Sequence, residues 1–190
     1  MRLFVAIPLA PALVAQLTAL TARLRRKDDS LRWTAPDSWH ITLAFLGATT
    51  PEQYQSLVPS LAAVHSPQIS IQLEALSTFP RAGVFFAGVQ VTPPLLTLQQ
   101  HLAAALIPCG FQPDARPFHP HITLARGKGR SSNQAALASL QSRLTTQPAF
   151  PSFTAREFLL YESFLEPSAA RYEIRNRFPL DHTGNGQHQF

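Results

Sequence analysis

Two histidines, each followed two residues later by a threonine, are the side chains in this sequence whose types and spacing could do chemistry. The pentapeptide that begins at His40 (His-Ile-Thr-Leu-Ala) recurs unchanged from His121. Imidazole titrates near neutral pH, so it can take a proton from a nucleophile or give one to a leaving group. Opening a phosphodiester needs both proton transfers, on opposite sides of phosphorus. The hydroxyls of Thr42 and Thr123 could donate hydrogen bonds to the non-bridging oxygens of such a phosphate.

The repetition of this pair indicates a functional role. A single His-x-Thr in a strand is most simply a packed or solvated histidine beside a residue that is common in strands. Here the same His–Thr pair is present in both copies of the repeat, although packing of the core does not require it. We therefore predict that His40 and His121 are catalytic and that Thr42 and Thr123 bind substrate. Neither pentapeptide contains a carboxylate, so the site suits an anion better than a divalent cation.

A zinc site is the alternative for this region. His119 precedes His121 by two residues, and with His40 these histidines could supply three nitrogen ligands. However, Pro120 separates the two neighbouring histidines, and the first repeat has Ser38 where the second has His119. We therefore expect neither a metal nor another cofactor.

An arginine follows the second pentapeptide. Arg126 occupies the position that Phe45 has after the first pentapeptide. Strict alternation along a strand would turn Arg126 away from His121. It stands at the expected end of the strand, however, beside Gly127, where the backbone can turn. From the residues alone, Arg126 is either a surface arginine or a substrate ligand.

The two motifs lie in a chain that repeats itself. His40 and His121 are 81 residues apart, and the same offset places 3–6 (Leu-Phe-Val-Ala) on 84–87 (Val-Phe-Phe-Ala). We expect one two-lobed domain over 1–180, with repeat halves at about 1–80 and 81–180, and a flexible tail at 181–190. Strands are expected at 3–7, 39–46, 69–73, 84–91, 119–126, 153–164 and 172–180, and helices are expected to begin near Pro11, Thr50, Pro93 and Ser132.

Strand geometry then predicts the fold. Side chains alternate between the faces of a strand, so each histidine shares a face with its threonine, and Ile41, Leu43 and Phe45 are expected on the opposite face. A hairpin signal at 80–83 (Pro-Arg-Ala-Gly) and a closing pair of strands favour antiparallel pairing. We therefore predict an α+β fold: two mainly antiparallel sheets flanked by helices around a central cleft, related by a pseudo-two-fold axis.

Composition indicates an anionic partner. Sixteen Lys and Arg oppose eleven Asp and Glu, a formal net charge of +5, and all but two of the sixteen are arginine. Because the planar guanidinium matches pairs of phosphate oxygens, this excess fits RNA. Lys128 and Arg130 would make the loop after the second motif basic. Cys109 is the sole cysteine, which excludes a disulfide within the chain and favours a cytoplasmic location, and no segment is apolar enough to span a membrane.

The paired motifs resemble the signature of the two-histidine phosphoesterase superfamily. More closely, the chain resembles the bacterial and archaeal RNA 2′,3′-cyclic phosphodiesterases, also known as 2′-5′ RNA ligases. The similarity runs nearly end to end and includes the segments 2–7, Arg32-Trp33, 39–47, 118–126, Tyr161-Glu162-Ser163 and Tyr172.

The resemblance implies an activity and a role for each candidate residue. Enzymes of this kind need no metal and hydrolyse 2′,3′-cyclic phosphate ends of RNA to 2′-phosphates. His121 would activate water and His40 would protonate the departing 3′ oxygen, although the sequence also allows the reverse. Thr42 and Thr123 would hold the phosphate, and Arg126 would contact the substrate. RNA ends or nucleoside 2′,3′-cyclic phosphates are the expected partners, and we expect a monomer.

Other functions remain open at this point. The same site could join RNA ends reversibly through 2′-5′ linkages, or it could act on a small nucleoside or ADP-ribose cyclic phosphate. From a different class, the protein could be an RNA-binding module without catalysis. Two titratable histidines argue against that last function, because binding alone does not need them.

Overall fold

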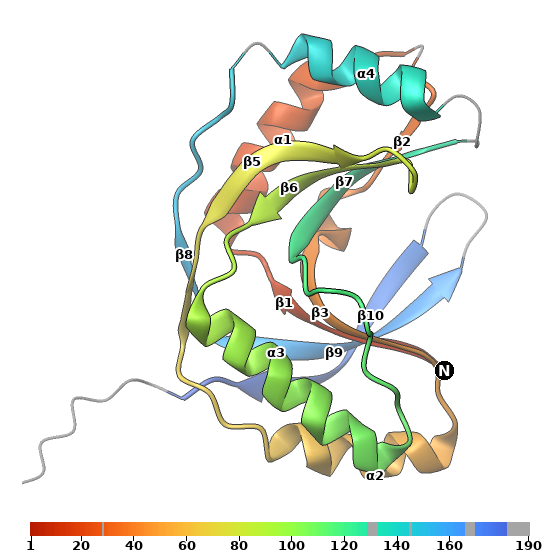
Figure 1. The fold of residues 1–190 in the computed structure, drawn as a ribbon, viewed down its shortest axis with the longest axis vertical. Coiled ribbons are helices and arrows are strands. Elements are labelled where there is room, and N and C mark those ends of the chain that lie inside the picture. Colours follow the sequence, from red (N-terminus) through yellow and green to blue (C-terminus); the bar gives the residue numbers. More distant parts are fainter. Residues whose placement is uncertain (28, 129–132, 145, 166–169, 182–190) are drawn as a thin grey trace, which may run out of the picture.

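The computed structural model describes residues 1–27, 29–128, 133–144, 146–165 and 170–181. Two four-stranded sheets form its two lobes, which lie one above the other along the long axis of the molecule (Figure 1). The first sheet has the order β10-β9-β1-β3 and the second has the order β2-β7-β6-β5. The strands are β1 (Arg2–Pro8), β2 (Leu31–Trp33), β3 (His40–Ala48), β5 (Leu73–Phe79), β6 (Val84–Val89), β7 (His121–Gly127), β9 (Glu157–Leu165) and β10 (Ala170–Pro179).

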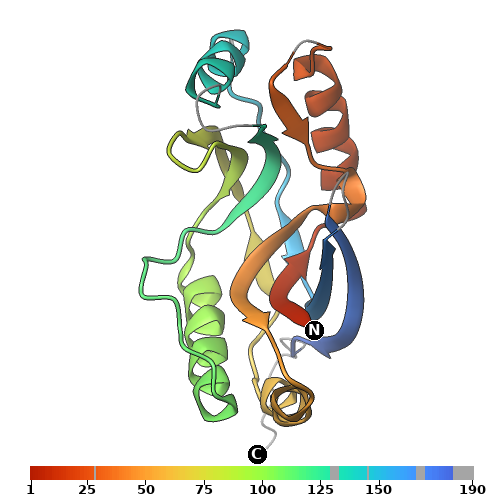
Figure 2. The same ribbon diagram turned by 90° about the vertical axis from the view of Figure 1, so that its right-hand side faces the viewer.

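Four helices flank these sheets. Helices α2 (Pro51–Ala62) and α3 (Pro93–Leu106) lie in the lobe of the first sheet, and α1 (Pro11–Leu24) and α4 (Asn133–Arg143) lie in the lobe of the second (Figures 1 and 2). All but α4 have a proline in the first turn, where a missing N–H does no harm. Thr50 and the side chain of Gln53 form the expected capping box of α2.

The two repeats exchange elements between the lobes. Helix α1 comes from the first repeat but lies with the second sheet, whereas α3 comes from the second repeat and contacts β3 of the first sheet. The sheets are mixed in the same way, because β5 of the first repeat pairs with β6 and β9 of the second repeat pairs with β1. Every strand pair in the two sheets is antiparallel. The predicted α+β class with two mainly antiparallel sheets is therefore confirmed.

Both motif strands contain a β-bulge at the same place. In the first sheet, Val5 pairs with Ala44 and Ala6 pairs with Thr42, which leaves Leu43 without a partner on β1. In the second sheet, Phe85 pairs with Ala125 and Phe86 pairs with Thr123, which leaves Leu124 without a partner on β6. An extra residue in one strand shifts the side chains that follow it to the other face. The two bulges are 81 residues apart, as are the histidines.

The predicted alignment of 3–6 with 84–87 is wrong by one residue. Phe4 pairs with Phe45, and the equivalent of Phe45, Arg126, pairs with Val84. Phe4 therefore corresponds to Val84, an offset of 80 rather than 81. The connection between the first strand and the motif strand is one residue longer in the second repeat, which a comparison without gaps cannot detect.

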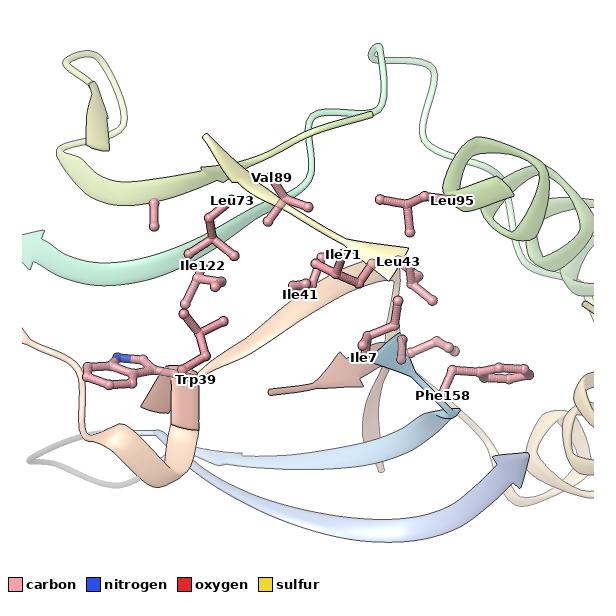
Figure 3. Packing of buried hydrophobic residues seen from close by; sticks show 14 of the residues in the cluster. Ile7, Trp39, Ile41, Leu43, Ile71, Leu73, Val89, Leu95, Ile122 and Phe158 are labelled. Carbon is pink, nitrogen blue, oxygen red and sulfur yellow. The ribbon is translucent and has the colours of Figure 1, made fainter. Parts of the chain in front are cut away.

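A continuous hydrophobic core lies beneath both motif strands. Ile41 and Leu43 of β3 belong to the same buried cluster as Ile122 and Leu124 of β7. Figure 3 shows Ile41, Leu43 and Ile122 packing with residues from both lobes, among them Val89 and Leu95. The aliphatic face of each motif strand is therefore buried as predicted, which fixes the orientation of the opposite, polar face.

Two expected strands are each divided in the structure. The segment 69–73 forms β4 (Ile69–Ile71), which pairs with β8 (Phe153–Ala155) in a separate two-stranded sheet, and β5, which begins at Leu73. The segment 153–164 is divided at Arg156 in the same way, into β8 and β9. The hairpin at 80–83 is confirmed, with Gly83 at a positive φ of 65°. The expected helix start at Ser132 and nearly all of the tail lie outside the described residues.

Within the part of the chain that is described, no helix has the length and apolar character needed to cross a membrane.

Candidate active site

The structure brings the two motif strands together. Residues of β3 and β7 approach within 8 Å, Cα to Cα, although the two strands belong to different sheets. Cross-strand partners share a face, so Pro8, Ala6 and Phe4 of β1 mark the face that carries His40 and Thr42. Gly88 and Phe86 of β6 mark the corresponding face of His121 and Thr123. We call these two surfaces together the site face.

Arg126 lies on the site face because of the bulge at Leu124. Leu124 and Ala125 are both fully buried, so the alternation skips one residue and Arg126 is exposed on the side of His121 and Thr123. Its strand partner Val84 is two residues from Phe86 on β6, a strand without a bulge here, which gives the same face. The expectation that strict alternation turns Arg126 away is therefore wrong, and no turn at Gly127 is needed.

The same correction applies to Phe45. The sequence predicts that Phe45 points to the core with Ile41 and Leu43, but its side chain is 70% exposed. The bulge at Leu43 moves Phe45 to the site face, where its ring lies 6.3 Å from that of Phe4. The two symmetry-related positions of the site face thus carry an arginine on one sheet and an exposed aromatic ring on the other.

Backbone carbonyls orient both imidazoles in the same way. Nδ1 of His40 lies 2.8 Å from the Ser38 carbonyl oxygen, and Nδ1 of His121 lies 2.7 Å from that of His119. Because a carbonyl can only accept, Nδ1 carries the proton and donates it in both rings. Nε2 is then the nitrogen available to a substrate: it accepts a proton when the ring is neutral and donates one when the ring is charged.

Aromatic side chains surround each histidine. The His40 ring lies 4.7 Å from Phe4 and 5.3 Å from Tyr172, and Phe4 stacks on Tyr161. The His121 ring lies 5.2 Å from both Phe79 and Phe86. These contacts hold the rings in place and reduce their exposure to water. Burial also raises the pKa of Tyr161 to about 12, so this phenol stays neutral.

The pKa of each histidine is lowered in the folded protein, which favours neutral imidazoles at neutral pH. The pKa of His40 is lowered from 6.5 to about 4, mainly by burial; the bond to the Ser38 carbonyl opposes this shift, and repulsion from Arg126, and from His121 when it is charged, adds to it. Burial likewise lowers the pKa of His121, and the charges of His119 and Arg126 act in the same direction. A bound phosphate would bring negative charge to this positive environment and raise the pKa of both imidazoles.

This shift predicts how stability depends on pH. The pKa of His40 is lower in the folded protein than in the unfolded chain, so on acidification the unfolded chain takes up the proton first. The stability associated with neutral His40 is therefore complete above about pH 6.5 and is lost as the pH falls towards 4. We expect acidification from pH 7.5 to 4.5 to lower the unfolding free energy of the wild type by roughly 2–3 kcal/mol more than that of His40→Gln. Urea unfolding at both pH values measures this difference, and parallel losses in the two proteins would contradict it.

The hydroxyls of Thr42 and Thr123 are on the site face and partly buried. Among the described residues, neither hydroxyl has a hydrogen-bond partner within the protein. Both are therefore free to donate to an oxyanion placed between the histidines.

Thr34 connects the two motif strands. Its hydroxyl accepts a hydrogen bond from the indole N–H of Trp39 (2.8 Å), and it donates towards the carbonyls of Thr123 (2.8 Å) and Leu124 (2.9 Å). Its backbone N–H also donates to the Leu124 carbonyl, at the bulge. Trp39 directly precedes His40. One side chain thus couples the position of His40 to the bulge that orients Arg126.

Thr34→Val is expected to weaken this connection. Valine has nearly the same shape but leaves the buried Trp39 N–H without an acceptor, which should lower the unfolding free energy by about 1–3 kcal/mol. We also expect a lower kcat, because the two histidines lose their fixed spacing. Thr34→Ser keeps the hydroxyl and should retain both properties. A valine variant as stable and active as the wild type, or a serine variant as impaired as the valine one, would refute this role.

The sequence offers His40, His119 and His121 as an alternative zinc site. The ring centroids of His119 and His121 are 6.4 Å apart, and both rings pack edge-on against Phe79 and Phe86. Within the described ranges, no group of three or more His, Cys, Asp or Glu side chains is arranged to hold a metal ion.

The fold and the site together define a class of protein. Two sheets related by an internal repeat, each with one His-x-Thr strand and each presenting Nε2 of an imidazole, are the arrangement of the two-histidine phosphoesterases. The chain belongs to the 2′-5′ RNA ligase superfamily, whose family model matches residues 8–163. The resemblance seen in the motifs is thus confirmed.

Individual relatives agree with this assignment. The RNA 2′,3′-cyclic phosphodiesterase of Geobacillus stearothermophilus is 32% identical over 200 residues, which cover 98% of this chain and 61% of that protein. The RNA 2′,3′-cyclic phosphodiesterase of Escherichia coli is 29% identical over 181 residues, covering 94% of this chain and 96% of that protein. The crystal structure of E. coli LigT complexed with 3′-AMP superimposes with a TM-score of 0.79 at 28% identity, over 94% of this chain and 97% of that chain.

Proposed function

We propose that this protein hydrolyses 2′,3′-cyclic phosphate ends of RNA to 2′-phosphates, with His40 and His121 as the acid–base pair. One observation carries the proposal: two equivalent imidazoles, each fixed through Nδ1, present Nε2 from strands of different sheets that meet at one site. Two-fold-related groups of this kind can act on opposite sides of a phosphorus atom, as in-line displacement requires.

In the reaction, one imidazole starts neutral and the other starts charged. His121 Nε2 takes a proton from water as the water oxygen bonds to phosphorus, and His40 Nε2 gives its proton to O3′ as the P–O3′ bond breaks. The product has its phosphate on O2′, and proton exchange with solvent restores both histidines. The pKa of His40 is about 4 in the free protein. The negative charge of the substrate raises this pKa, so that His40 can be protonated in the complex and act as the acid.

The remaining site residues bind rather than transfer protons. We propose that Thr42 and Thr123 donate to the non-bridging phosphate oxygens, and that Arg126 balances their charge. Phe45 offers an exposed aromatic surface on the site face, on which a base can stack. The similar E. coli protein has been solved in complex with 3′-AMP, which supports a nucleotide ligand for this chain.

We further propose that the protein works as a monomer in the cytoplasm, with RNA ends or nucleoside 2′,3′-cyclic phosphates as substrates. Both motif strands come from a single chain, so the site needs no second copy. The sole cysteine, Cys109, is buried and is not paired in a disulfide, as fits a reducing compartment.

A substrate panel tests the function. Purified protein in excess EDTA should hydrolyse RNA oligonucleotides that end in a 2′,3′-cyclic phosphate and should leave 3′,5′-cyclic nucleotides and linear RNA intact. Turnover of small cyclic phosphates alone would favour a small-molecule enzyme, and joining of RNA ends without hydrolysis would favour a ligase. Binding of RNA without turnover would contradict the proposal, as would activity that is lost in EDTA and restored by a divalent metal.

A further inference from the structure

Two arginines lie directly opposite each other beside the proposed reaction centre. Arg32 of β2 pairs with Arg126 of β7 in the antiparallel register of the second sheet. Side chains at directly opposite positions share a face, with Cβ atoms about 4.5–5.5 Å apart. Because Arg126 lies on the site face, Arg32 does as well, and both side chains are exposed. Arg32 is thus one strand further out on the same surface as His121 and Thr123.

Like charges in this position destabilise a sheet unless something neutralises them. Among the described residues, neither Arg32 nor Arg126 has an acidic partner, whereas on β10 the side chains of Arg175 and Arg177 pair with Glu162 and Glu157. Two adjacent guanidinium groups without a counter-charge form a favourable site for a phosphate, because each planar fork can donate to two oxygens.

The spacing places Arg32 further from the reacting phosphate than Arg126 is. Gly88 and Val84 of β6, the partners of His121 and Arg126, are four residues apart, which is about 13 Å along a strand. The charge of Arg126 nevertheless contributes to the lowered pKa of both histidines, so its guanidinium interacts electrostatically with them. Arg32 stands roughly 5 Å beyond Arg126, across one strand spacing. Arg126 therefore lies between the reacting phosphate and a second phosphate that Arg32 can contact.

A third cation continues the series. The backbone N–H of Lys128 donates to the Ser30 carbonyl (3.0 Å), which extends the pairing of β2 and β7 beyond Arg126. Lys128 is exposed directly after the end of β7, two residues beyond Arg126. On the first sheet, the position equivalent to Arg126 carries Phe45, so the repeat does not reproduce this cation there.

We propose that Arg32, together with Arg126 and Lys128, binds the phosphodiester on the 5′ side of the terminal nucleotide. The site then selects the ends of RNA chains over free 2′,3′-cyclic mononucleotides, which lack that phosphate. This selectivity rests on the function proposed above. The terminal base stacks towards the first sheet while the RNA backbone leaves over the second.

Arg32→Gln tests the proposal, with Arg23→Gln as the matched control. Arg23 is an exposed arginine of α1 beside a hollow lined by Gln16, Arg143 and Phe150, away from both motif strands. We expect Arg32→Gln to lower kcat/KM on a cyclic-phosphate-ended oligonucleotide about tenfold more than on the matching 2′,3′-cyclic mononucleotide, the scale of one charge-assisted hydrogen bond. Arg23→Gln should leave the ratio of the two rates unchanged. Because Arg32 and Arg126 carry like charges at facing positions, removing one of them should not lower the stability of the fold. Thermal unfolding of the variant checks this.

A binding measurement keeps the test independent of turnover. The probe is an RNA oligonucleotide with a 2′-phosphate end, made with either a normal phosphodiester or a neutral methylphosphonate at its last linkage. The neutral linkage should weaken binding to the wild type about tenfold, but it should hardly affect Arg32→Gln. Arg32→Gln should also reduce the slope of log K against log salt by about 0.7, the value for one phosphate contact on a single strand.

The possible failures differ from one another. If the wild type binds the probe as expected but hydrolyses neither cyclic substrate, the proposed function is wrong and the subsite stands. If Arg32→Gln impairs the oligonucleotide and the mononucleotide equally, or if its effect adds to that of the methylphosphonate, the subsite is refuted and the proposed function stands.

Discussion

His121→Ala is expected to lower turnover of a cyclic-phosphate-ended RNA by about a hundredfold to ten-thousandfold, and His40→Ala should do the same. This is the usual range for a positioned acid or base, and it corresponds to about 3–5 kcal/mol of activation barrier. The two losses should not add, because a displacement without one proton transfer no longer uses the other. Steady-state kinetics of the two single variants and the double variant measure these effects.

Stability provides the control for this prediction. Both imidazoles lie on the site face and contact aromatic rings there rather than the aliphatic cluster beneath the strands, so we expect both variants to remain folded at pH 7.5. The wild type should also show a bell-shaped dependence of rate on pH, with one limb for each histidine. If either variant unfolds but its folded fraction turns over at the normal rate, the histidine in question is structural and the proposed pair does not exist.

Arg126→Ala is expected to act on affinity, raising KM roughly 10- to 100-fold while kcat changes less. Hydrogen bonds to charged groups contribute about 1.5–3 kcal/mol, which corresponds to this range. Arg126→Lys should restore the charge but not the planar fork, and so recover only part of the affinity. Measuring kcat and KM separately for both variants tests this role. A fall in kcat with unchanged KM would instead place Arg126 on the developing charge of the transition state.

The same arginine shows where prediction from sequence succeeds and where it fails. The identity of the histidines and threonines, and the face that they share, follow from local alternation within a repeated pentapeptide. The faces of Arg126 and Phe45 do not, because each depends on a bulge whose position is set by pairing with another strand. At Leu124 that bulge is held by Thr34, a residue 90 positions earlier in the chain. No local pattern encodes such a contact.

Residues that reach the site only through tertiary structure could not be predicted from the sequence for the same reason. Tyr161 and Tyr172 meet Phe4 and His40 only because β9 and β10 cross from the second repeat into the first sheet. Arg32 was visible in the sequence as part of the family resemblance, but its function depends on the register of β2 against β7. For Phe45 the sequence did contain a signal of a role in the site, because Phe45 follows the first pentapeptide as Arg126 follows the second.

The position of the phosphate in the product tests the central proposal most directly. An RNA oligonucleotide with a 2′,3′-cyclic phosphate is incubated with the wild type in excess EDTA, and the product is identified by ³¹P NMR. Attack of water opposite O3′, between His121 and His40, predicts a terminal 2′-phosphate as the sole product, formed at the same rate without EDTA. A 3′-phosphate would show that the other ester bond breaks, and absence of product in EDTA would show that the two histidines do not suffice.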